Sequence, residues 1–222
     1  MKDELPFETT EEQLIIEGRS FRIRHVSDSD ALFERLLNLP EDHPDVKDER
    51  IPYWAEVWPA AIGLAEHVIR YSNQLIGKDV LEIGCGLGLP GIVAGCYANQ
   101  VVMTDYLSEA VSMAEHNWQL NHTHSPLMKT FDWRSCDPSL KASVILASDV
   151  AYEQRMFFPL LSALHDLLSD DGVVWLSEPD RHFARVFFDT LDRQGFSVEH
   201  KEHSVVRKAI TYRVNVHVLK KK

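Results

Sequence analysis

The chain has 222 residues, a hydrophobic fraction of 45% and a formal net charge of −11. This length suits one hydrophobic core, and no apolar run approaches the roughly 20 residues that a membrane span needs. The negative charge disfavours binding to a phosphate backbone, so we expect a soluble protein that binds neither membranes nor nucleic acid.

The N-terminal region is predicted to form an extension in front of the main domain. Its elements are a β-hairpin over 13–26, a short helix over 28–39 and a charged, proline-containing loop over 40–50. We assign residues 1–50 to this extension and residues 51–222 to the main domain. The first residues carry acids where a signal peptide would be basic and then apolar, so we expect a cytoplasmic location.

The main domain alternates short apolar runs with helix-period segments. Pro59 begins a predicted helix, and the expected strands span 79–83, 100–105, 127–133, 142–149, 173–178, 196–203 and 209–219. The last two strands have no helix between them, which predicts an antiparallel pair. We therefore expect an α/β fold: a doubly wound, mostly parallel, seven-stranded Rossmann-like sheet with an antiparallel C-terminal hairpin.

The helix before this pair is expected to turn apolar side chains inward. The side chains expected to face inward are Phe183, Val186, Phe187, Thr190 and Leu191. The three cysteines, Cys85, Cys96 and Cys136, show no C-x-x-C pairing, which indicates free thiols. His122 and His124 lack a third ligand at a recognisable spacing, so we expect no metal site.

The stretch "VLEIGCGLGLPGIVAG" after the first parallel strand can be interpreted in two ways. The spacing G-x-G-x-x-G from Gly86 matches the dinucleotide fingerprint. The alternative begins at Glu82 and places Gly84 at the end of the strand. In a dinucleotide site the first glycine of the fingerprint directly follows the strand, and Gly86 comes two residues too late for that. An anion at Glu82 suits a cationic amino group better than pyrophosphate. Because Asp105 stands where an acid can bind ribose hydroxyls, S-adenosylmethionine is favoured over NAD.

Three acids follow neighbouring strands of the predicted sheet, namely Glu82, Asp105 and Asp149. Ligands of open α/β sheets bind outside the carboxyl ends of the strands, where all three acids would lie. Each acid could instead cap the segment that follows it. Three acids at one edge are hard to explain by capping alone, so we expect a ligand site.

Several segments together resemble a known family. "LEIGCGLGLPG", "VVMTDY", "FDW" and "ASDVAYE" resemble the class I, seven-β-strand methyltransferases, and "PYWAEVWPAAIGLAEHV" resembles their family 16, or METTL-type, protein lysine methyltransferases. The resemblance covers about residues 52–179. It implies S-adenosylmethionine as the cofactor.

The resemblance also implies roles for particular residues. Glu82, Gly84 and Gly86 would shape the methionine end of the pocket, and Asp105 would hold the ribose. The other implied cofactor contacts are Trp58, Asp132, Trp133 and Ser148. Asp149 and Tyr152 match the family's Asp-x-x-Tyr/Phe motif at the substrate mouth and are the implied catalytic pair. Without the resemblance, Trp58 and Trp133 could equally be core aromatics.

The expected function is S-adenosylmethionine-dependent N-methylation of a protein lysine. The first alternative is methylation of a small amine such as nicotinamide, and the second is a non-catalytic cofactor-binding or partner-binding module. A nicotinamide-dependent oxidoreductase is third. The sequence contains no G-x-S-x-G elbow for a serine hydrolase, and it carries no signal for an oligomeric state.

Overall fold

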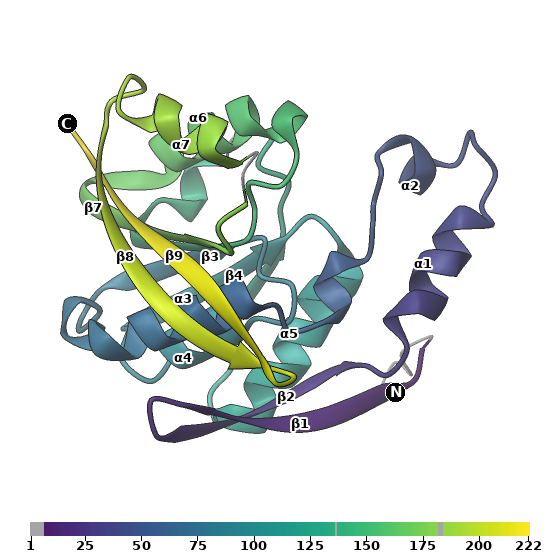
Figure 1. Cartoon of the computed structure of the whole chain (residues 1–222). Coiled ribbons are helices and arrows are strands. Elements are labelled where there is room, and N and C mark those ends of the chain that lie inside the picture. Colours follow the sequence, from purple (N-terminus) through teal and green to yellow (C-terminus); the bar gives the residue numbers. More distant parts are fainter. Residues whose placement is uncertain (1–6, 136, 182–183) are drawn as a thin grey trace.

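A seven-stranded sheet with the order β5-β4-β3-β6-β7-β9-β8 forms the centre of the protein (Figure 1). The computed structural model describes residues 7–135, 137–181 and 184–222. The sheet strands are β3 (Asp79–Ile83), β4 (Gln100–Asp105), β5 (Leu127–Thr130), β6 (Ala142–Ser148), β7 (Leu168–Glu178), β8 (Phe196–Arg207) and β9 (Ile210–Lys221). Strands β3 to β7 run parallel, whereas β9 is antiparallel to both β7 and β8, which confirms the predicted fold class.

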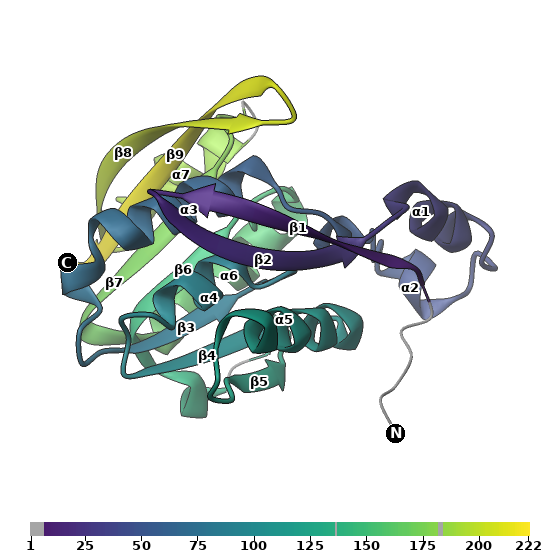
Figure 2. The same cartoon turned by 90° about the horizontal axis from the view of Figure 1, so that it is seen from below.

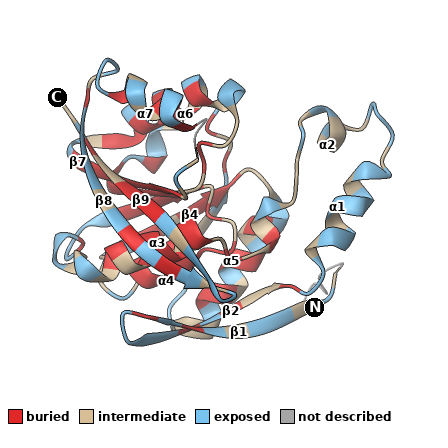
Figure 3. Cartoon of the chain, viewed as in Figure 1, coloured by how far each residue is buried: buried red, intermediate tan, exposed pale blue. Residues whose placement is uncertain are grey.

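Helices cover both faces of the sheet, and a separate hairpin of β1 (Thr9–Ile16) and β2 (Arg19–Val26) lies outside them (Figures 1 and 2). The helices are α1 (Ser29–Leu37), α2 (Pro44–Lys47), α3 (Pro59–Arg70), α4 (Leu89–Ala94), α5 (Ser108–Asn121), α6 (Phe157–Leu167) and α7 (Arg185–Leu191). One core cluster joins the hairpin, α3, α4 and α5 to one face of the sheet, and a second joins α6 and α7 to the other. Figure 3 shows that buried residues concentrate in the central strands and the helices around them, whereas α1 and β1 are largely exposed.

The order of the strands creates a switch point beside β3. The chain moves from β3 outward through β4 to β5, and then returns to the opposite side of β3 to form β6. Strands β3 and β6 are apolar and almost wholly buried, as central parallel strands require. In sheets of this kind the crevice outside the carboxyl ends of the strands at the switch point is where ligands bind.

Most local predictions agree with the structure, although β5 ends at Thr130 and not at residue 133, and β7 begins at Leu168 and not at residue 173. Two further predictions differ. The loop predicted over residues 40–50 contains the short helix α2, which His43 caps and Pro44 begins. In α7, Phe187 and Leu191 are buried as expected, but Val186 is 55% exposed. The prediction for Phe183 lies outside the described residues, as does Cys136. Cys85 and Cys96 are free cysteines.

The N-terminal hairpin packs against α5. Asn117 accepts a hydrogen bond from the Arg24 backbone and donates one back to the Arg24 carbonyl, and it also donates to the Leu87 carbonyl in the glycine loop. Phe21 and Ile23 belong to the same core cluster as α3. The hairpin is thus fixed to α5, which also bonds to the glycine loop, and the division of the chain at residue 50 stays a prediction.

His67 is a buried titratable residue of α3 that lies outside the predicted ligand site. Its Nδ1 lies 3.3 Å from Nε2 of His203, and its ring packs against Trp175. Burial, with a smaller contribution from His203, lowers the pKa of His67 from 6.5 to about 3. Between about pH 3 and pH 6.5 the unfolded chain therefore binds a proton at His67 that the folded chain does not bind. The free energy of unfolding that depends on His67 is fully present above pH 6.5 and is lost as the pH falls below it.

We expect His67 to reduce the free energy of unfolding by about 1 kcal/mol over roughly the first pH unit below its unfolded pKa. Urea unfolding at a series of pH values measures this slope. His67→Gln is expected to flatten it, and an unchanged slope in that variant would contradict the assignment.

None of the described helices is both long and apolar enough to cross a membrane.

Candidate functional site

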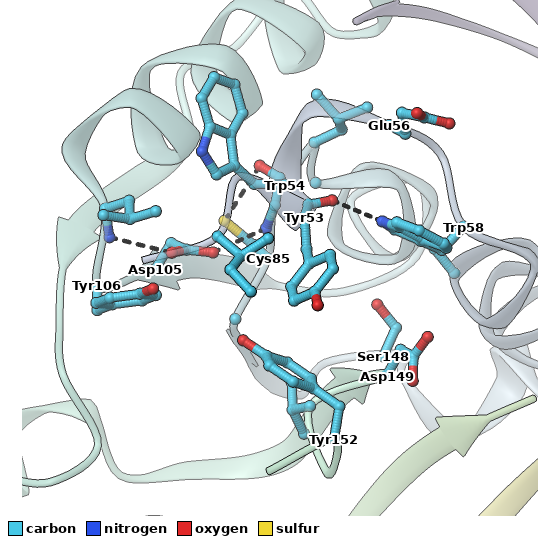
Figure 4. Close-up of a pocket in the computed structure, with 18 of the residues that line it drawn as sticks. Tyr53, Trp54, Glu56, Trp58, Cys85, Asp105, Tyr106, Ser148, Asp149 and Tyr152 are labelled. Atoms are coloured by element: carbon cyan, nitrogen blue, oxygen red, sulfur yellow. Dashed lines mark hydrogen bonds between the residues drawn. The ribbon is translucent and has the colours of Figure 1, made fainter. Parts of the chain in front are cut away.

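A cavity of about 450 Å³ opens at the switch point of the sheet (Figure 4). The segments after β3, β4 and β6 form its floor, and the segment between α2 and α3 forms the opposite wall. Eight of the predicted site residues line it: Trp58, Gly84, Gly86, Asp105, Trp133, Ser148, Asp149 and Tyr152. Glu82 and Asp132 are not among the lining residues.

The glycine loop after β3 is shaped by close contacts. Gly84 has a φ of +61°, and a Cβ there would lie 2.8 Å from the Val150 side chain. A Cβ on Gly91, at the start of α4, would lie 2.4 Å from Oε2 of Glu82. Both the backbone and the space require glycine at Gly84, and the space alone requires it at Gly91. The loop therefore lies tightly against β6 on one side and against Glu82 beneath it.

Glu82 supports the loop from behind instead of pointing into the cavity. Its side chain is fully buried, and Oε2 accepts a hydrogen bond of 3.0 Å from the Gly91 backbone. Burial raises the pKa of Glu82 well above its usual value, which favours the neutral acid. The expectation that Glu82 presents an anion to the crevice therefore finds no support in its position.

A neutral, supporting Glu82 gives a direct prediction. Glu82→Gln keeps an oxygen for the Gly91 amide, so we expect the free energy of unfolding at neutral pH to change by less than about 1 kcal/mol. Glu82→Ala leaves that buried amide without its acceptor and should cost roughly 1 to 3 kcal/mol. Denaturant unfolding of both variants measures the difference, and a Gln variant as unstable as the Ala variant would show that the charge is needed.

Asp105 ends β4 and bonds to the loops on both sides of it. Oδ2 accepts from the Gly86 backbone at 3.0 Å, and Oδ1 accepts from the Leu107 backbone at 3.1 Å. The side chain is buried, contrary to the open crevice expected for this acid, and burial raises its pKa to about 6. Asp105 therefore orders the glycine loop and still lines the cavity.

Asp132 lies beside the cavity and is already paired. Arg134 donates hydrogen bonds to Asp132 and to Asp48, the residue that follows α2. Asp132 lines a smaller adjoining pocket together with Tyr106 and Trp133. Trp133 contributes to both pockets, so these two implied cofactor contacts occupy different positions. Asp132 anchors the N-terminal segment, and Trp133 reaches the main cavity.

Aromatic rings enclose the opening. Tyr53 and Tyr152 meet edge to face with ring centroids 5.3 Å apart, and Figure 4 shows the two rings facing each other near Ser148. Trp58 donates a hydrogen bond of 2.6 Å to the Tyr53 carbonyl, which fixes the segment in front of α3. Burial raises the pKa of Tyr152, so its phenol stays neutral at physiological pH. Such a ring can orient a side chain but is not a base.

Asp149 is held by an ion pair that the sequence analysis missed. Arg181 donates two hydrogen bonds to its carboxylate, at 3.1 and 2.8 Å, and both residues line the cavity. Burial raises the pKa of Asp149, and the bonds from Arg181 act in the opposite direction. The backbone of Asp149 has a φ of +52°, in the left-handed region that residues other than glycine adopt uncommonly.

Glu178 fixes Arg181 from behind. Its Oε2 accepts from the Arg181 backbone at 2.8 Å, and its Oε1 accepts from Asn215 of β9 at 2.7 Å. The acid at the end of β7 is thus a support for the Asp149–Arg181 pair. Sequence reasoning missed Arg181, although a basic residue shortly after a strand end at this edge is a usable signal.

Other cavity residues were also missed, namely Tyr53, Trp54, Cys85 and Tyr106. Tyr53 and Trp54 belong to the segment in front of α3, and the aromatic composition of this segment was the signal available in the sequence. Among the described residues no group of three or more histidines, cysteines or acids is arranged to hold a metal ion. His122 instead contacts the Ile92 carbonyl and packs against Trp118.

Comparisons with known proteins identify relatives of this chain. A sequence model of a family described as lysine methyltransferase matches residues 47–194. Human histone-arginine methyltransferase METTL23 is 31% identical over 54% of this chain and 66% of its own length. The Dictyostelium discoideum histidine protein methyltransferase 1 homolog is 29% identical over 68% of this chain and 50% of its own length. The chain thus spans less than two thirds of either relative.

Another relative is covered more fully. Zebrafish protein N-lysine methyltransferase METTL21A is 32% identical over 74% of this chain and 78% of its own length. Among solved structures, magnesium protoporphyrin IX methyltransferase from Synechocystis PCC 6803 with bound SAM superposes with a TM-score of 0.58. It covers 88% of this chain and 92% of its own chain at 18% identity, which shows the same fold.

Proposed function

We propose, because this chain belongs to the lysine methyltransferase family, that it transfers a methyl group from S-adenosylmethionine to the side-chain amine of a protein lysine. The observation that carries the proposal is that the glycine loop, Asp105, Asp149 and Tyr152 all line the same cavity. Its volume lies within the range of about 300 to 1,000 Å³ that is typical of small-ligand sites.

The residues of the cavity fit the parts of this cofactor. The glycine loop leaves room for a ligand against the backbone, and the ionised Asp105 can accept hydrogen bonds from ribose hydroxyls. Trp133 and Tyr106 offer flat faces to a base. Trp58 and Ser148 stand on the side toward Asp149. When bound, S-adenosylmethionine supplies a methyl group already activated by the sulfonium.

The chain's own contribution is to receive and orient the acceptor amine. A free lysine has a pKa of about 10.4 and arrives as an ammonium ion. An ionised carboxylate has about four acceptor sites, and Arg181 uses two of those on Asp149, so an ammonium can share this carboxylate. The ammonium gives its proton to water at the opening, and Tyr53 and Tyr152 then confine the neutral amine. Alignment of the neutral amine supplies the rate enhancement.

Acidic side chains at the cavity support a basic protein acceptor over a nucleic acid. Glu49, Glu56 and Glu153 all belong to its lining, and the whole chain carries a charge of −11. Such an edge attracts a basic peptide and repels phosphate. The free thiols of Cys85 and Cys96 agree with a reducing compartment, so we include a cytoplasmic location in the proposal.

Relatives named for arginine and histidine acceptors define the test. Methyl-labelled S-adenosylmethionine is incubated with the protein and a fractionated lysate, and the labelled material is hydrolysed. The expected product is methyllysine in protein. Methylarginine, methylhistidine or a labelled small molecule would overturn the acceptor. Calorimetry separates the cofactors: S-adenosylmethionine should bind, whereas tight NAD binding without any response to the sulfur compound would end the methyltransferase interpretation.

A further inference from the structure

Residues 28–47, named here the acidic arm, stand away from the body of the protein and carry α1 and α2 (Figures 1 and 2). No residue of α1 or α2 is buried. Yet α1 holds four large apolar side chains in one stripe, Leu32, Phe33, Leu36 and Leu37. Phe33 is 41% exposed and Leu37 is 67% exposed. A nine-residue helix is marginal without packing, so this stripe has the character of a contact surface.

Both ends of the acidic arm are fixed beside the cavity. At its start, Ser29 donates a hydrogen bond to Glu56, which lines the cavity. Directly after its end, Asp48 accepts two hydrogen bonds from Arg134, and Glu49 lines the cavity. A partner that lies on the arm is therefore held next to the opening that leads to Asp149.

The charge of the acidic arm indicates which kind of partner it attracts. It carries six acidic residues against only Arg35 and Lys47 as basic residues, a net charge of −4. The described part of the chain offers no ion pair to Asp30, Glu34, Glu41 or Asp42. A second copy of this chain would bring the same excess of acids, so self-association on this surface is opposed by repulsion. A basic segment is attracted to it.

We propose that the acidic arm docks a basic segment of the protein substrate, which places apolar side chains on the Phe33 and Leu37 stripe and its lysine in the cavity. This inference rests on the proposed function. Charge attraction speeds the encounter, and the apolar contact gives the bound segment a defined position.

Two arm variants separate these contributions. Phe33→Ser with Leu37→Ser removes the apolar contact and keeps the charge. Asp30→Asn with Glu34→Gln keeps the apolar contact and reduces the net charge of the arm from −4 to −2. All four positions are exposed, so the fold should persist. The matched controls are Ile76→Ser with Leu127→Ser, which are exposed apolar residues outside the arm, and Asp170→Asn with Asp171→Asn, which are exposed acids in β7.

Binding is measured first, without methyl transfer. The probe is a fluorescent peptide of alternating lysine and leucine residues, and the same pattern with glutamate serves as the comparison. We expect the lysine peptide to bind the wild type and both controls, and to lose about tenfold in affinity with each arm variant. The charge variant should also show a weaker salt dependence of binding than the wild type. Equal affinity in arm and control variants would overturn the proposal.

Turnover is measured second, on the lysine protein found by labelling. The arm variants should lower kcat/KM by about tenfold and leave S-adenosylmethionine affinity unchanged. Arm variants that methylate this protein like the wild type would overturn the docking surface and leave the proposed function standing. Absence of methyl transfer by the wild type, with peptide binding still lost in the arm variants, would overturn the proposed function alone. A dimer that dissociates in the Phe33 and Leu37 variant would assign the stripe to a second copy.

Discussion

Asp149→Asn is expected to lower the rate of methyl transfer by about tenfold or more, which corresponds to roughly 1.4 kcal/mol per decade. The reason is that asparagine keeps the size of the side chain but removes the charge that would receive an ammonium ion. An amide oxygen can still accept from Arg181, so the fold should be retained. Steady-state transfer to the labelled lysine protein and calorimetry with S-adenosylmethionine measure the two effects, and cofactor affinity should change only slightly.

The ion pair with Arg181 makes a second comparison necessary, because Asp149 could act only by holding that arginine. A double-mutant cycle with Arg181→Met resolves this. If Asp149 contacts the amine, Asp149→Asn still reduces transfer in the Arg181→Met background. If Asp149 merely positions Arg181, the second substitution adds nothing. Wild-type turnover by Asp149→Asn alone would remove the residue from the acceptor site.

The sheet was predictable because its signals are local. The buried strands β3 and β6 are short apolar runs, and the missing helix between β8 and β9 is visible as two strand patterns in succession. Helix α2 was missed because its composition of charges and prolines is that of a loop. Its formation depends on the His43 cap and on Pro44 in the first turn, which are weak signals in a four-residue helix.

The site was predictable in its location and less so in its contacts. Spacing placed Glu82, Asp105 and Asp149 at one edge, but it could not show that Glu82 faces the Gly91 amide or that Asp105 bonds to Gly86. The partner of Asp149 is 32 residues away in sequence. Such pairs depend on how neighbouring loops fold back over the sheet, and periodicity within one strand or helix carries no information about that.

Asp105→Ala is expected to weaken S-adenosylmethionine binding by roughly 1 to 3 kcal/mol, the usual cost of losing hydrogen bonds to a charged group. The substitution also leaves the Gly86 and Leu107 amides without their acceptor, so thermal unfolding must accompany the calorimetry. A second variant, Asp105→Asn, preserves the size of the side chain. Unchanged cofactor affinity in a folded variant would remove the ribose assignment.

The pH dependence of binding tests the same carboxylate without relying on the alanine variant. The pKa of Asp105 is raised to about 6, so the ionised acceptor is present above that pH and is lost as the pH falls through it. Binding to the ionised form predicts that wild-type affinity is highest above pH 6 and declines toward about tenfold per pH unit below it. Asp105→Asn cannot titrate, so its affinity should be lower but flat across this range. A decline in the Asn variant that matches the wild type would assign the titration to another group and leave the ribose without its proposed acceptor.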